Sequence, residues 1–314
     1  MNKYILFISL ILLAGCYRVS DQIDPRVSSP VQEQHLRELC SAFPPLTPEE
    51  RSTEWGKELY IARRFADELD LYRAISTYNR AEFLLPVADH ARAHQIEYDT
   101  LFCYFLSGRY QDAINYFDKS GLAHVDKSFP AHCDLLLVLY ESYGELEVDD
   151  KQLCILEMME KSYPETAEKL KLSRAIRGAD MPQIDRFASG FQNDSYLSQM
   201  MDSYDVKKKS VAGAQILNAI LPGAGYLYLG QRTSAFTAFM LNGLFIAAAY
   251  HFFHRGQVPA GVITTLFESG WYFGGIYGAG LEAKYYNERM YENSAQVVLN
   301  ERKLFPILML EHAF

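Results

Sequence analysis

The sequence predicts an all-α protein in which a helical domain is followed by a membrane hairpin, on three observations. Of its 314 residues, 49% are hydrophobic and 22% charged, which supplies a buried core and excludes a disordered chain. Apolar residues recur at helical spacing, and no segment shows the sustained alternation of β-strands. A hydrophobic, glycine-rich segment from Val211 to Leu281 follows a more polar N-terminal two-thirds. The length suits one or two domains.

The charge balance excludes one class of partner. The chain has 30 lysines and arginines against 39 acidic residues, a formal charge of -9, and its longest basic block is Lys207 to Lys209. A protein that binds the phosphate backbone of nucleic acid needs a basic face. We therefore expect no nucleic-acid partner.

The N-terminus has the layout of a secretory signal, with Lys3 ahead of the apolar run Ile5 to Leu13. The string Leu13-Ala14-Gly15-Cys16 resembles the lipobox of bacterial lipoproteins. This resemblance implies that residues 1–16 are the signal peptide and lipobox, that Cys16 is lipidated, and that the protein is exported to the bacterial envelope. An uncleaved N-terminal anchor is the alternative, although the apolar run is too short to span a bilayer.

A tether and a helix start follow the lipobox. Residues 17–46 are rich in Ser, Pro and polar residues, which suits a tether between lipid and domain. Thr47, Pro48 and Glu50 then occupy the cap, first and third positions of a capping box. We expect a helical domain over residues 47–206, with a break between Gly178 and Pro182.

Two stretches of this domain repeat one pattern of small and aromatic residues. The first copy contains Ala62, Phe65, Ala74, Tyr78, Ala81 and Pro86, and the second contains Tyr104, Gly108, Tyr110, Ala113 and Phe117. A third, degenerate copy contains Tyr140, Tyr143, Leu156 and Pro164, with Gln152 where alanine is usual. The pattern resembles the tetratricopeptide repeat, which implies a short solenoid of stacked helix pairs that binds a protein or peptide. A generic helical bundle is the alternative.

Residues 207–285 form the predicted membrane hairpin region. Thr233 to Phe253 is a run of 21 uncharged residues, long enough to cross about 30 Å of hydrocarbon. A short polar turn leads to a second span at 258–281, whose one acidic residue is Glu268. The preceding apolar stretch, 211–229, is interrupted at Asn218 and at Pro222, as in a broken or partly inserted helix. A buried helical hairpin of a soluble protein is the alternative.

The string from Leu221 to Gly230, LPGAGYLYLG, resembles a motif of small bacterial membrane hairpin proteins of the TM2 type. In these proteins a Pro-Gly turn and a Tyr-x-x-Gly element precede two spans. The resemblance covers roughly residues 215–285 and implies a topology, not an activity.

Small residues of the second span predict a helix contact in the membrane. Gly270, Gly274 and Gly278 recur every four residues, so they share one helix face and permit close approach of another helix. The partner is either the first span, through Gly243 and Ala247, or another copy of the chain in a homo-oligomer.

Two polar residues of the spans predict a contact as well. Asn242 and Glu268 lie at nearly equal depth, and we expect a hydrogen bond between them that holds the hairpin together. A proton path through Glu268 is the alternative, but the spans offer no second carboxyl group.

No motif points to an enzyme, a metal or another cofactor. The spacings of Cys40, Cys103, Cys133 and Cys154 match no paired zinc pattern. His90 and His94 lie four apart but without the HExxH signature, and no nucleotide-binding or nucleophile motif occurs. We expect no catalytic residue and no cofactor.

These features together predict a membrane-bound scaffold. Residues 286–314 suit an amphipathic C-terminal tail. The lipid anchor places the helical domain in the periplasm, and the spans favour the inner over the outer membrane, although the basic block at Lys207 prefers the cytoplasmic side.

The expected function is a scaffold or assembly factor of the envelope that binds a protein or peptide. A small oligomeric transporter or channel subunit is the alternative.

Overall fold

The computed structural model of the chain describes residues 18–27, 33–190 and 195–314. Over these residues the fold is all-helical, and the one β-type contact is an isolated bridge between Ser41 and Ala313. The predicted all-α class is therefore confirmed. Cys16 and its lipobox lie outside the described residues, so lipidation stays a prediction.

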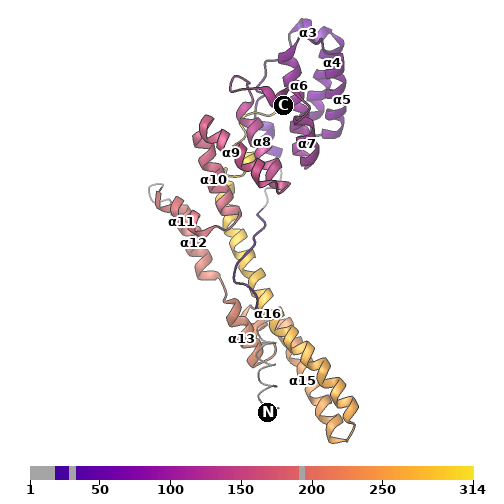
Figure 1. Ribbon diagram of the computed structural model, residues 1–314, viewed down its shortest axis with the longest axis vertical. Helices are drawn as coiled ribbons and strands as arrows, with labels where there is room; N and C mark the ends of the chain where they lie inside the picture. The colour runs from indigo at the N-terminus through magenta and orange to yellow at the C-terminus, as the bar shows by residue number, and fades with distance from the viewer. Residues whose placement is uncertain (1–17, 28–32, 191–194) are drawn as a thin grey trace. The chain divides into compact units, whose positions relative to one another are not determined.

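The helices of the described segments are α2 (Glu33–Glu38), α3 (Pro48–Ser52), α4 (Glu54–Asp67), α5 (Leu71–Leu84), α6 (His90–Leu106), α7 (Tyr110–Phe117), η1 (Gly121–His124), α8 (His132–Glu145), α9 (Asp149–Ser162), α10 (Pro164–Arg177), α11 (Met181–Gly190), α12 (Ser195–Lys207), α13 (Val211–Ile220), α14 (Ala224–Tyr228), α15 (Arg232–His254), α16 (Val258–Glu301) and α17 (Pro306–Met309). Figure 1 labels most of them along the chain.

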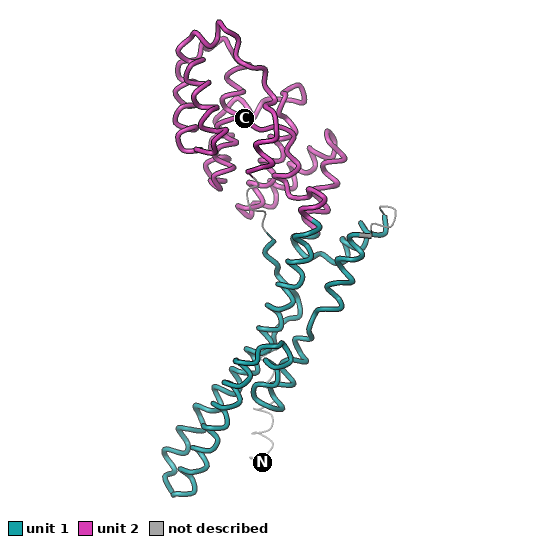
Figure 2. The backbone as a smooth tube through the Cα atoms, turned by 180° about the vertical axis from the view of Figure 1, so that it is seen from behind, with its two compact units in different colours: residues 1–27, 176–298 teal, residues 28–175, 299–314 magenta. Residues whose placement is uncertain are grey.

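The chain divides into two compact units, coloured separately in Figure 2. Unit 1 comprises residues 1–27 and 176–298, and unit 2 comprises residues 28–175 and 299–314. The expected helical domain over 47–206 is thus shared between the units, and the chain returns to unit 2 after residue 298. The sequence analysis did not predict that the last residues of the chain belong to unit 2.

Unit 2 is built from helix pairs whose small residues allow close packing. α4 packs on α5, α6 on α7, and α8 on α9. Ala62, Ala74 and Tyr78 of the first predicted repeat are fully buried, as is Ala113 of the second. The expected role of these residues in the core is confirmed, while membership of the repeat family stays a prediction. In the third copy the amide of Gln152 is buried and donates to the carbonyl of Tyr140 at 3.2 Å.

The predicted helix start at Thr47 is confirmed. The Thr47 hydroxyl accepts from the amide of Glu50, and the Glu50 carboxylate accepts from the amide of Thr47 at 2.6 Å. Glu50 also accepts from the guanidinium of Arg92 at 2.8 Å, which lowers the pKa of Glu50. Arg92 in turn donates to the carbonyl of Pro44 at 2.8 Å. The end of the expected tether is therefore fixed to α6, and Phe43 is buried in the core.

The last residues of the chain are part of the core of unit 2. The buried carboxylate of Asp134 accepts from the amide of Glu311 at 2.9 Å and lies 2.8 Å from Nδ1 of His312. The ring of Phe314 meets that of Phe102, with their centroids 5.0 Å apart. Residues 286–314 are therefore not one amphipathic tail, because α16 continues to Glu301 and the remainder packs inside unit 2.

In unit 1, polar side chains tie separate segments to the second half of α16. The side-chain amide of Asn287 accepts from the Lys209 amide at 2.7 Å and donates to the Lys209 carbonyl at 2.8 Å. The amide of Arg26 donates to Glu292 at 2.7 Å. Residues 18–27, expected to belong to a free tether, therefore lie along α16.

The core of unit 2 contains an acid without a full set of partners. Asp99 on α6 is completely buried, and neither carboxylate oxygen has a hydrogen-bond partner among the described residues. Burial raises the pKa of Asp99 to about 7, although Arg63, Gln95 and Tyr78 lie close enough to offset part of the rise. The folded chain therefore holds a proton on this carboxyl more tightly than the unfolded chain does.

The raised pKa predicts a pH-dependent stability. The contribution of neutral Asp99 is complete below the unfolded pKa of about 4 and is lost as pH rises towards 7. The Asp99→Asn variant does not show this loss of stability, because the asparagine side chain does not titrate. The free energy of unfolding of the variant, relative to wild type, should therefore rise by as much as about 4 kcal/mol over that range. Denaturant titration of the full chain in detergent micelles at several pH values measures the difference. The exposed Asp112→Asn is the control, and parallel profiles for Asp99→Asn and wild type would contradict the assignment.

Candidate functional site

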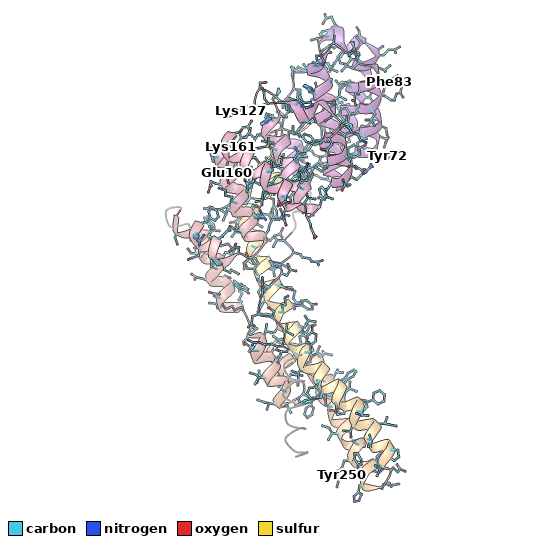
Figure 3. All side chains as sticks on the ribbon, viewed as in Figure 1. Tyr72, Phe83, Lys127, Glu160, Lys161 and Tyr250 are labelled. Atoms are coloured by element: carbon cyan, nitrogen blue, oxygen red, sulfur yellow. The ribbon has the colours of Figure 1, made fainter. Side chains whose placement is uncertain are left out.

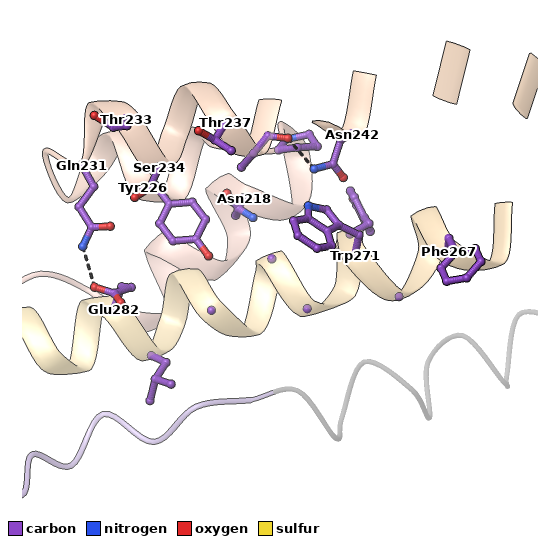
Figure 4. Close-up of a pocket in the computed structure, with 18 of the residues that line it drawn as sticks. Asn218, Tyr226, Gln231, Thr233, Ser234, Thr237, Asn242, Phe267, Trp271 and Glu282 are labelled. Carbon is purple, nitrogen blue, oxygen red and sulfur yellow. Dashed lines mark hydrogen bonds between the residues drawn. The ribbon is translucent and has the colours of Figure 1, made fainter. Parts of the chain in front are cut away.

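The candidate site is a cleft of about 840 Å³ in unit 1, between α15 and α16 (Figure 4). α13 and α14 close one end of it. Its wall on the α16 side includes Gly270, Gly274, Gly275 and Gly278. The opposite wall carries the side chains of Thr233, Ser234, Thr237 and Asn242 from α15. Four of the predicted site residues, Asn242 and the glycines of the stripe, therefore line one cleft, whereas Glu268 does not.

The LPGAG string forms the turn that brings α13 and α14 against the hairpin. Gly223 adopts a left-handed φ of 94°, and its amide donates to the side chain of Asn218 at 2.8 Å. A Cβ at Gly225 would lie 2.3 Å from the backbone oxygen of Ala214. The interruption predicted at Asn218 and Pro222 is thus a tight corner that only glycines permit at these two positions.

This corner predicts opposite effects for two glycine-to-alanine changes. Gly225→Ala inserts a methyl group against backbone and should destabilise unit 1 by about 1–3 kcal/mol. Gly274→Ala has no neighbouring atom within 4 Å of the new Cβ and should be neutral or slightly stabilising. Unfolding of the full chain in mixed micelles, followed by circular dichroism, compares the two. Equal stabilities would show that the corner is not packed as described.

Polarity changes along the cleft, as Figure 4 shows. At one end the amide of Gln231 donates to the Glu282 carboxylate at 2.6 Å and closes the space between the helices. At the other end Phe267 and Trp271 supply aromatic surface and are each more than half exposed. The cleft is therefore amphipathic along its length.

Asn242 is the most buried polar residue of the hairpin wall, at 4% exposure. Its amide nitrogen donates to the Ala238 carbonyl of its own helix at 2.6 Å. Its carbonyl oxygen and Oε2 of Glu268 are both buried without a hydrogen-bond partner among the described residues. The expected hydrogen bond between Asn242 and Glu268 is thus not formed among the described residues, and the Asn242 amide donates to its own helix instead.

The glycine stripe does not pack against the first span. A Cβ at Gly270, Gly274 or Gly243 would meet nothing within 4 Å. At Gly278 it would lie 2.5 Å from the hydroxyl of Tyr226, so this position is approached by α14 instead. Of the two expected partners, the first span does not contact Gly270 or Gly274, and contact with another copy of the chain stays a prediction.

The exterior of the hairpin is apolar. Only Ala235 and Asn242 are buried among the 23 residues of α15. Its large exposed side chains are Phe236, Phe239, Met240, Leu244, Ile246, Tyr250 and Phe253. Within the described part of the chain, α15 is the one helix long and apolar enough to cross a membrane. The second span expected at 258–281 falls within α16, which does not meet the same criterion, so a membrane hairpin stays a prediction.

The histidines and cysteines considered in the sequence do not line this cleft. The described residues contain no group of three or more His, Cys, Asp or Glu side chains that could hold a metal ion. The ring of His94 lies beside Gly121, whose amide donates to Glu97 at 2.9 Å, so these residues fix a loop of unit 2. Cys40, Cys103, Cys133 and Cys154 are free thiols, and burial raises the pKa of Cys133 to about 12.

Comparison with protein-family models, with curated proteins and with solved structures gives no match to this chain. Sequence reasoning found Asn242 and the glycine stripe from spacing alone. It did not find Asn218, Tyr226 or the Gln231–Glu282 pair, because these contacts depend on how α14 folds back onto the hairpin.

Proposed function

We propose that the protein is a membrane-anchored scaffold or assembly factor of the bacterial envelope. In this proposal the lipid on Cys16 and the hairpin of unit 1 attach the chain to the inner membrane, and unit 2 binds a protein or peptide on the periplasmic side. The observation that carries the proposal is the apolar surface of α15, whose large hydrophobic side chains are exposed and whose only buried residues are Ala235 and Asn242.

The size and exposure of α15 support a membrane location. Its 23 residues extend about 34 Å, close to the thickness of the hydrocarbon core. Contiguous apolar patches of this extent are rare on soluble monomers and mark surfaces that are covered by lipid or protein. Tyr250, near the turn of the hairpin, projects outwards (Figure 3), as aromatic residues do at a membrane interface.

The surface of unit 2 supports a protein-binding role. Tyr72 and Phe83 on α5 are 78% and 89% exposed, and Figure 3 shows both projecting from the helix. They are eleven residues apart, which places them on the same helix face three turns from each other. Exposed aromatic side chains on a rigid helix are favoured anchors of protein interfaces.

The open cleft favours a second candidate function. A buried Asn242 oxygen without a partner and an open glycine stripe suit a helix-lined assembly of several copies, which is the arrangement of a small transporter or channel subunit. Within the predicted spans, Glu268 is the one carboxylate available to such an assembly. Unit 2 would then be an accessory.

Membrane insertion is tested with the two tryptophans of the chain. Trp271 is 51% exposed on the hairpin, whereas Trp55 is buried in the core of unit 2. In vesicles that contain brominated lipid, the Trp55→Phe variant, which retains Trp271, should lose most of its fluorescence. The matched Trp271→Phe variant should lose little. Equal quenching of the two variants would contradict insertion of the hairpin.

The scaffold role is tested with a photo-crosslinking residue at Phe83 or Tyr72 in the full chain. The full chain is needed because residues 299–314 belong to unit 2. Both positions should crosslink to the same partner in native membranes, and the partner should be lost in a Phe83→Asp, Tyr72→Asp double variant. Crosslinks only between copies, together with solute flux in proteoliposomes, would instead establish the transporter alternative.

A further inference from the structure

A second pocket, of about 340 Å³, lies in unit 2 and is rich in arginine. Arg51 of α3 and Arg63 and Arg64 of α4 line it together with Tyr60, and Asp67 is the one carboxylate in its wall. Pro45 and Phe314 complete the wall with apolar surface. All these residues belong to unit 2, and none of them takes part in the cleft of unit 1.

Two of the arginines share one aromatic ring. The Cζ atoms of Arg51 and Arg64 lie 4.7 Å and 5.7 Å from the centroid of the Tyr60 ring. Contact with the ring stabilises each guanidinium. Its N–H groups remain free to donate, because they point outwards in the plane of the guanidinium itself. The ring therefore holds two like charges in the lining of one small pocket.

The positive charge of this pocket is only partly balanced. Asp67 approaches Arg64 at 3.9 Å, the outer limit of an ion pair. No carboxylate of the described residues forms an ion pair with Arg51 or Arg63. Asp67 and buried Asp99 are both within electrostatic reach of Arg63. Burial raises the pKa of both carboxyl groups, that of Asp99 to about 7, which leaves Asp99 partly neutral. By contrast, Arg80 and Arg109 elsewhere in unit 2 meet carboxylates at 2.8 Å and 2.7 Å.

We propose that this pocket binds the carboxylate side chains of an acidic segment in a partner protein. The inference rests on the proposed role of unit 2 as a protein-binding unit and specifies the chemistry of its ligand. Arginine guanidinium groups match carboxylates in planar, two-bond geometry, and Arg51 and Arg63 supply the donors. The apolar wall formed by Pro45, Tyr60 and Phe314 receives an apolar residue next to the acidic one.

The shape of the pocket favours a peptide over a free inorganic anion. A volume of about 340 Å³ is roughly ten times the share of one water molecule in liquid water, so it holds one or two side chains. A phosphate ion would leave the apolar wall uncovered. We therefore expect affinity to depend on both the acidic and the apolar residues of the ligand.

The test measures binding of a fluorescent peptide of alternating glutamate and leucine to the full chain in neutral detergent micelles. A peptide with glutamine in place of glutamate is the matched ligand. Arg51→Gln and Arg63→Gln are the variants. Arg109→Gln is the control, because Arg109 also stacks on a tyrosine, with its Cζ 4.8 Å from the Tyr104 ring centroid, but pairs with Asp112. Thermal unfolding of each variant establishes that it is folded.

Wild type and Arg109→Gln should bind the glutamate peptide equally, and the glutamine peptide should bind at least tenfold more weakly. Each pocket variant should also lose at least tenfold in affinity, and added salt should weaken wild-type binding. Equal binding of both peptides, or unchanged binding by Arg51→Gln and Arg63→Gln, would overturn the inference. Displacement by inorganic phosphate or by phosphatidylglycerol vesicles, but not by unlabelled glutamate peptide, would also overturn it. If the crosslink from Phe83 to a partner persisted despite such a result, the proposed scaffold role would still be supported. Only the proposed acidic ligand of the arginine pocket would be wrong.

Discussion

The outward apolar surface of α15 and of the first half of α16 is the constraint on which unit 1 depends. Hydrophobic side chains stabilise a fold in water when they are buried, and here almost none of α15 is buried. Such an exposed apolar surface is compatible with a stable hairpin only if lipid or another protein covers it. Its backbone polar groups are already paired within the helices, as a bilayer requires. The proposed attachment of the chain to the membrane rests on this surface.

The inside of the hairpin shows the complementary arrangement. Helices in a membrane gain little from hydrophobic contact with one another, so small residues and polar groups direct their association. The cleft displays both, since Gly270 and Gly274 are open and the Asn242 oxygen is unsatisfied. An unsatisfied buried oxygen costs about 1–3 kcal/mol, which a hydrogen bond from an approaching helix or ligand would recover. The cleft thus combines open glycines with a buried oxygen that has no hydrogen-bond partner among the described residues.

Local signals were read correctly from the sequence, and contacts between distant residues were not. The capping box at Thr47 and Glu50 depends on residues three apart, and the burial of Ala74 and Tyr78 follows from helical spacing. By contrast, the contact of Asp134 with His312 joins residues 178 apart, and no local pattern marks it. The Asn242–Glu268 pair was inferred from depth alone, and equal depth does not bring two side chains within hydrogen-bond distance of each other.

The arrangement of the hairpin is tested most directly by spin-label accessibility in lipid vesicles, with the exposed Cys40 and Cys154 replaced by serine. Labels are placed at Phe239 on the apolar face of α15, at Thr237 in the cleft, and at the exposed Lys161 of unit 2. The account predicts that the Phe239 label collides more often with oxygen than with a water-soluble nickel chelate, that the Lys161 label does the reverse, and that Thr237 lies between them. A Phe239 label as accessible to the chelate as the Lys161 label would contradict a hairpin whose apolar face contacts lipid.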